Sequence, residues 1–125
     1  MSTHERVREF LESVAKRRTP ITYRELAKGL DVLPPCSIHE VTEALERLME
    51  EDAAANRAFI AALAISKTRG GLPAPGFFDC ARRLGRFVDG QDAESYHAAE
   101  LIAVFARWGS PRKDQSPFRS GGISR

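Results

Sequence analysis

Cysteine is scarce in this chain of 125 residues, which contains only Cys36 and Cys80. The two lie far apart and form no C-x-x-C pair, so we expect neither a disulfide framework nor a paired-cysteine zinc motif. Long apolar runs are lacking too, and none approaches the roughly 18 residues of a membrane-spanning helix. The first ten residues, MSTHERVREF, are rich in charge. These features predict no signal peptide, no membrane contact and a reduced, cytoplasmic location in a bacterium.

The motifs of most enzymes are also missing. The stretch RGGLPAPGFFDCARRLG (residues 69–85) is rich in glycine, but no GK[ST] follows, and Pro73 and Pro75 offer no N–H to a phosphate. Cys36 and His39 have the spacing of half a metal site, without a second pair of ligands. The sequence therefore predicts no metal, no cofactor and no enzymatic activity.

Carboxylates are plentiful in one segment of the chain. Residues 38–52 contain six acidic residues, and no histidine or serine is tied to them by a recognisable motif. They fall largely opposite the apolar positions of the segment, as on a solvated helix face. The six are Glu40, Glu43, Glu46, Glu50, Glu51 and Asp52.

Helical periodicity dominates what is present. Apolar residues recur at helical spacing in residues 4–18, 23–30, 38–52 and 92–108, and residues 77–85 predict a further short helix. Ser2 or Thr3 is expected to cap the first of these helices, and Thr22 with Glu25 and Ser37 with Glu40 have the spacing of capping boxes. The apolar run AFIAALAIS (residues 58–66) predicts a strand, with residues 20–22 as its neighbour.

This order of elements predicts an α+β fold that is mostly helical. We expect a winged helix-turn-helix core with a short two-stranded sheet and extra C-terminal helices. Residues 1–108 would form this domain, and the basic tail at residues 109–125, rich in Ser, Gly, Pro and Arg, would be flexible. Phe77 and Phe78 are expected to anchor the loop ahead of them in the core.

Three stretches of the chain resemble a group of small uncharacterised bacterial proteins: ITYRELA (residues 21–27), NRAFIAALAISK (residues 56–67) and GLPAPGFFDCARRLG (residues 71–85). That group has a G-x-P-G-x-G-F-F loop, and here Ala74 stands where a glycine is common. The resemblance implies a shared winged-helix-like fold, and it implies no activity.

A weaker resemblance is to the C-terminal domain of DNA alkyltransferases. That domain is a winged helix that begins with a T-x-Y-x-E-L/I-A phrase, matched here by Thr22–Ala27. Its chemistry needs a Pro-Cys-His-Arg strand after the third helix, whereas this chain has AALAIS there and places Pro35–Cys36 before the third helix. The resemblance therefore implies the topology without alkyl transfer.

Charge is distributed unevenly, although the net charge is only +2. The acidic segment at residues 38–52 has Arg47 as its only lysine or arginine, so the third helix would be repelled by DNA. Positive charge collects in residues 16–28, in residues 67–86 and in the tail. The predicted nucleic-acid-binding residues are Arg17, Arg18, Arg24, Lys28, Lys67, Arg69, Arg82, Arg83 and Arg86.

Two functions remain open at this point. The first is a non-enzymatic module whose wing loop and basic patches contact the nucleic-acid backbone with little sequence readout. The second is a protein-interaction module, or a homodimer, that uses the acidic third helix or the C-terminal helix.

Overall fold

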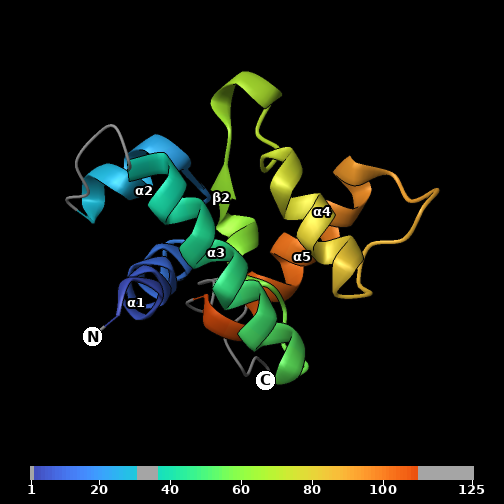
Figure 1. Cartoon of the computed structure of the whole chain (residues 1–125), viewed down its shortest axis with the longest axis horizontal. Helices are drawn as coiled ribbons and strands as arrows, with labels where there is room; N and C mark the ends of the chain where they lie inside the picture. The colour runs from blue at the N-terminus through green and yellow to red at the C-terminus, as the bar shows by residue number, and fades with distance from the viewer. Residues whose placement is uncertain (1, 31–36, 110–125) are drawn as a thin grey trace, which may run out of the picture.

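The computed structural model describes residues 2–30 and 37–109, most of which are helical (Figure 1). In chain order the elements are α1 (Thr3–Lys16), β1 (Ile21–Thr22), α2 (Tyr23–Gly29), α3 (Ser37–Ala54), the 3₁₀ helix η1 (Ile60–Leu63), β2 (Ala64–Ile65), the 3₁₀ helix η2 (Lys67–Arg69), α4 (Pro75–Arg83) and α5 (Ala93–Trp108). The mostly helical architecture with a two-stranded sheet agrees with the prediction. None of the described helices is both long and apolar enough to span a membrane. Cys36, the cap expected from the Ser37 side chain and the tail from residue 110 lie outside what the structure describes.

Local capping fixes where the first two helices begin. The Ser2 side chain accepts a hydrogen bond from the backbone N–H of Glu5, and the Glu5 carboxylate accepts one in return from the Ser2 N–H. Thr22 and Glu25 form the same reciprocal pair at the start of α2. Each pair satisfies backbone donors that a helix start leaves free. Both capping predictions are confirmed.

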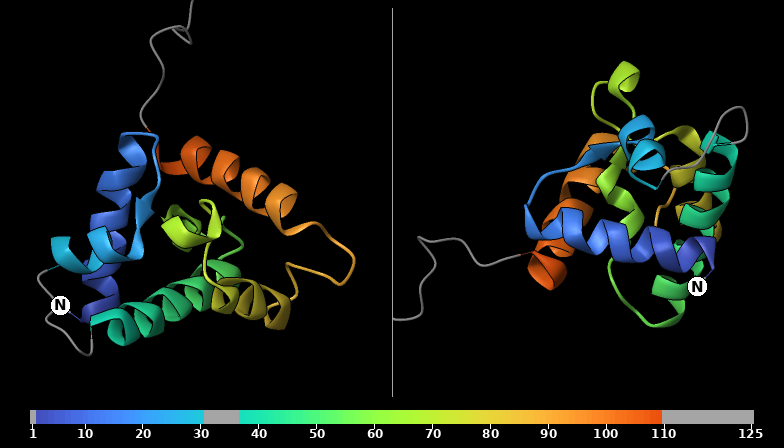
Figure 2. Two further views of the ribbon diagram at one scale, coloured as in Figure 1. Left: turned by 90° about the horizontal axis from the view of Figure 1, so that it is seen from above. Right: turned by 90° about the vertical axis from the view of Figure 1, so that its left-hand side faces the viewer.

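The segment Phe59–Ala64 is the centre of the fold. No side chain in it is more than 2% exposed. Helices α1, α3 and α5 surround the η1 part of this segment on three sides (Figure 2). Burial of these apolar side chains is therefore what holds the three long helices together.

The predicted continuous strand over residues 58–66 is wrong for most of its length, because Ile60–Leu63 is a 3₁₀ helix and only Ala64 and Ile65 form a strand. The partner strand has just two residues, so most of the segment must satisfy its buried N–H groups elsewhere. Phe59 N donates to Glu100 Oε2 at 2.7 Å, and Ile60 N donates to Asp52 Oδ2 at 3.1 Å. Side-chain acceptors thus replace a neighbouring strand.

The sheet pairs two segments that are distant in sequence. β1 and β2 are parallel, with Ile21 opposite Ala64 and Thr22 opposite Ile65. This confirms residues 20–22 as the origin of the partner strand. After β2 the chain turns back, and one antiparallel bridge joins Ser66 to Leu72. We call residues 66–72 the finger, because this turn projects beyond the helices beside α4 (Figure 1).

Phe77 and Phe78 hold the chain that follows the finger. Their side chains are buried at the start of α4, as predicted. The two rings meet edge to face with centroids 5.2 Å apart, and Phe78 also contacts Phe87 at 5.3 Å. Tyr96 of α5 packs on Phe87 at 5.0 Å. Aromatic packing therefore joins α4 and α5 through the turn between them.

Candidate nucleic-acid interface

Five of the nine predicted cations are placed around α2. Arg24 and Lys28 are exposed on α2 one turn apart, Arg17 directly follows α1, and Lys67 and Arg69 belong to η2. We call these five residues the α2–η2 patch. All five are exposed.

Two members of this patch lower the pKa of the Glu25 carboxylate. Hydrogen bonds from the Thr22 backbone and hydroxyl lower the pKa of Glu25, and the positive charges of Lys67 and Arg17 lower it further. Lys67 and Arg17 are distant in sequence, and the parallel pairing of β1 with β2 brings the segments that carry them to the start of α2. Two of the five cations thus act on this one capping carboxylate.

A groove of about 480 Å³ separates the first turn of α2 from the base of the finger. It begins where both strands end, because it is lined by the residues at the β1–α2 and β2–η2 junctions. These residues are Thr22, Tyr23, Arg24, Glu25, Ile65, Ser66, Lys67 and Thr68. Arg24 and Lys67 therefore belong to opposite walls of one groove, where both can contact the same anionic chain.

Two hydrogen bonds fix the loop that supports the finger. Ala74 N donates to the Tyr23 hydroxyl at 2.8 Å, and Arg69 Nε donates to the Pro73 carbonyl at 3.0 Å. Burial raises the pKa of Tyr23 further above neutrality, so the phenol is protonated at neutral pH as an ordinary tyrosine is. These hydrogen bonds hold the loop against α2, and they stabilise the turn of the finger that carries Lys67.

The other four predicted cations have partners within the protein, although Arg82 and Arg83 are exposed. Arg18 donates to the Phe105 carbonyl at 3.4 Å and lies 5.5 Å from the centre of the Phe105 ring, which links α1 to α5. Arg82 pairs with Asp79 and Asp89, at 3.3 and 3.2 Å.

Arg83 and Arg86 are likewise engaged within the protein. Arg83 pairs with Glu50 of α3 at 3.0 Å. Arg86 lies 4.5 Å from the centre of the Phe59 ring and 3.8 Å from Glu100 Oε2. The structure thus places five of the nine residues around α2, where Arg69 alone hydrogen-bonds another described residue, and gives the other four partners on α3, α4, α5 or the turn after α4.

The acidic face predicted for the third helix is present along α3. Glu40, Glu43 and Glu50 are exposed. Arg47, the one guanidinium of the segment, is exposed among them. This face would repel phosphate, so it is unsuited to contact with nucleic acid.

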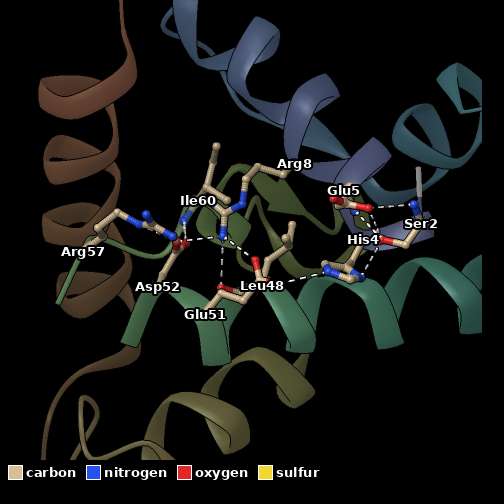
Figure 3. Close-up of polar contacts among 9 residues, drawn as sticks. All are labelled: Ser2, His4, Glu5, Arg8, Leu48, Glu51, Asp52, Arg57 and Ile60. Carbon is tan, nitrogen blue, oxygen red and sulfur yellow. Dashed lines mark hydrogen bonds and ion pairs between the residues drawn. The ribbon is translucent and has the colours of Figure 1, made fainter. Parts of the chain in front are cut away.

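The predicted solvated face is wrong at Asp52, because the side chain of this residue is fully buried. Asp52 Oδ1 accepts from Arg8 at 2.8 Å and from Arg57 at 3.0 Å, and Oδ2 accepts from the Ile60 N–H (Figure 3). Arg8 also reaches Glu51 at 3.3 Å. A buried carboxylate needs such partners, and here they join α1, α3 and η1.

The sequence contains one signal of this burial. Asp52 follows Leu48 by four residues, which places it on the apolar stripe of α3 with Val41 and Leu45. A charged residue on a buried stripe predicts an internal partner. Nothing in the spacing identifies Arg8, which is distant in sequence.

The described residues contain no group of three or more His, Cys, Asp or Glu side chains placed to hold a metal ion. Cys80 is buried, and that burial raises the pKa of its thiol. It therefore lacks the thiolate character of a reactive cysteine. Cys36, the other half of the weighed metal pair with His39, lies outside the described residues.

No protein-family model, curated protein or solved structure matches this chain. The resemblances to small bacterial proteins and to the alkyltransferase C-terminal domain stay predictions.

Proposed function

We propose that this chain is a non-enzymatic module that binds the nucleic-acid backbone through the α2–η2 patch. The observation that carries the proposal is the availability of its charges. The side chains of Arg17, Arg24, Lys28 and Lys67 form no hydrogen bond or ion pair with any other described residue. Phosphate oxygens are the common ligands of such exposed, unpaired cations.

We also propose a winged helix-turn-helix core for residues 3–72, with the finger as its wing. The order α1, β1, α2, α3, β2 and the antiparallel bridge at Ser66 and Leu72 support this assignment. The finger is short, and the acidic α3 is unsuited to the major groove. The mode of binding is therefore backbone contact across the groove between α2 and the finger, with little sequence readout.

Salt dependence tests this proposal directly. Fluorescence anisotropy with a short labelled DNA, duplex or single-stranded, should show binding that weakens steeply as salt rises. Arg24→Gln combined with Lys67→Gln should weaken binding. On duplex DNA it should also lower the magnitude of the log–log salt slope, by about 0.9 for each phosphate that the variant no longer neutralises.

The matched control is Arg82→Gln combined with Arg83→Gln. It removes the same net charge from residues that already have carboxylate partners. Equal weakening by the two double variants would mean that only total charge matters. Absence of binding to either DNA at low salt would overturn the proposal.

A second candidate function is protein association through α5. Ile102, near the middle of that helix, is 71% exposed, and the alanines at positions 98, 99, 103 and 106 are exposed around it. A helix that is apolar on its outward face favours a partner. Sedimentation analysis tests this, because Ile102→Lys should abolish any self-association of the wild-type chain.

A further inference from the structure

A small cavity opens between α2, α3 and the start of α4, and we call it the Glu46 pocket. Its volume is about 70 Å³. The walls include Leu45 and Met49 of α3, Phe77 of α4 and the ring of Tyr23. Of these side chains, Tyr23 alone is partly exposed, so the pocket is an apolar recess with a polar edge.

The Glu46 carboxylate supplies much of that polar edge. It is half-buried, and with the other described residues it forms no hydrogen bond or ion pair. Neighbouring carboxylates differ: Glu50 pairs with Arg83 at 3.0 Å, and Glu51 pairs with Arg8 at 3.3 Å. A partly desolvated carboxylate without a partner favours a cationic ligand.

Glu46 also lines a larger open groove along the outer face of α3. This groove has a volume of about 470 Å³ and receives Thr3 and His4 from α1. Its carboxylates are Glu40, Glu43, Glu46 and Glu50, against the single guanidinium of Arg47. An apolar recess therefore opens beside an acidic groove, with one carboxylate common to both.

This arrangement selects the chemistry of an occupant. Nucleic acid and anionic membranes are repelled by four carboxylates. An apolar small molecule would leave Glu46 without a partner, and a simple cation would leave the walls of the pocket unused. A basic polypeptide that carries an aliphatic side chain satisfies both, because it supplies an apolar anchor and cations for the surrounding rim.

We propose that the Glu46 pocket and the α3 groove form a docking site for a basic segment of a partner protein. One aliphatic side chain of that segment fills the pocket against Met49 and Phe77. Its adjacent lysine or arginine pairs with Glu46, and further cations lie along Glu40 and Glu43. Tyr23 lines both this pocket and the groove beside the finger, but none of the five cations of the α2–η2 patch lines the Glu46 pocket or the α3 groove. The loss of DNA binding would therefore leave this proposal intact.

The probe for the test is a short synthetic peptide with one leucine between pairs of lysines. NMR titration of the full chain at low salt should shift the Met49 methyl and Tyr23 ring signals. A peptide with alanine in place of the leucine should leave the Met49 methyl unshifted. Glu46→Gln should weaken binding of the leucine peptide by about threefold to fivefold, as expected for loss of a partly exposed ion pair.

The control variant is Glu9→Gln, which removes the same charge from an exposed position of α1 that does not line the groove or the pocket. It should leave the affinity unchanged apart from a small general effect of net charge. Each of three results would overturn the proposal: no shift of either signal at millimolar peptide, equal binding of the alanine peptide, or equal weakening by both variants. Shifts that appear with protein concentration alone would identify a second copy as the occupant and would also overturn it.

Discussion

The arginines of α4 and the cations around α2 carry the same charge and differ in what faces them. Arg82 and Arg83 lie within 3.3 Å of carboxylates on α3, α4 and the turn after α4. Arg24 and Lys67 line an open groove with only the capping carboxylate Glu25 between them. The number of positive residues along a chain therefore does not measure the charge that is available to a ligand.

The largest effect of a substitution on stability is expected in the interior, at the buried carboxylate of Asp52. Asp52→Asn removes the charge that Arg8 and Arg57 share, and it leaves two guanidinium groups without their buried partner. We expect the free energy of unfolding to fall by about 3–5 kcal/mol, as when one member of a buried pair is lost. Urea denaturation followed by circular dichroism measures this.

Glu43→Gln is the matched control for Asp52→Asn. Glu43 lies on the same helix and is exposed, and its ion pair with His39 spans 3.5 Å at the surface. An equal loss of stability in both variants would contradict the structural role assigned to Asp52. On the proposed function, the Asp52 variant should bind DNA as the wild-type chain does wherever it remains folded.

Substitution of Arg86 should have an intermediate effect on the free energy of unfolding, because the Arg86 side chain is partly buried. Arg86→Gln removes the cation from the face of Phe59 and a hydrogen bond to the Asp52 carbonyl at 3.4 Å. We expect a loss of about 1–2 kcal/mol in the free energy of unfolding. If the unfolding midpoint were unchanged and DNA binding were weaker, Arg86 would instead belong to the proposed DNA-binding surface.

His97 should make the stability of the interior depend on pH. Burial lowers its pKa, while Nε2 lies 2.9 Å from the Ala62 carbonyl oxygen. As pH falls, the unfolded chain therefore takes up this proton before the folded chain does. The contribution to stability is complete well above the ordinary histidine pKa of about 6.5 and is lost as pH falls through that value.

Denaturation midpoints across this range test the assignment to His97. His97→Gln keeps an N–H donor for Ala62 and cannot be protonated, so the decline with pH should become shallower. An unchanged pH profile in this variant would assign the decline to other groups.

The smallest effect is expected at the surface of α4. Arg83→Gln breaks an exposed pair with Glu50, and such pairs often contribute nothing measurable. Its unfolding midpoint and its affinity for DNA should both match those of the wild-type chain. A clear loss of DNA binding would contradict the proposed difference between the arginines of α4 and the cations around α2.

Features set by neighbours in sequence could be predicted, and features set by distant residues could not. The cap of α2 depends on Thr22 and Glu25, three residues apart, and its prediction holds. The 3₁₀ path of Ile60–Leu63 follows acceptors from Asp52 and Glu100, and nothing local identifies Glu100. For the same reason the sequence could not separate Arg86, which stacks on Phe59, from Lys67, which faces solvent.

The enclosure of η1 by α1, α3 and α5 has a consequence for how the chain is made. Until the final helix is in place, the apolar centre has one open side and remains in contact with water. We therefore expect stable folding on the ribosome to wait until Val104 and Phe105 have emerged from the exit tunnel. Nascent chains arrested before α5 should stay sensitive to protease, whereas chains arrested well beyond it should resist.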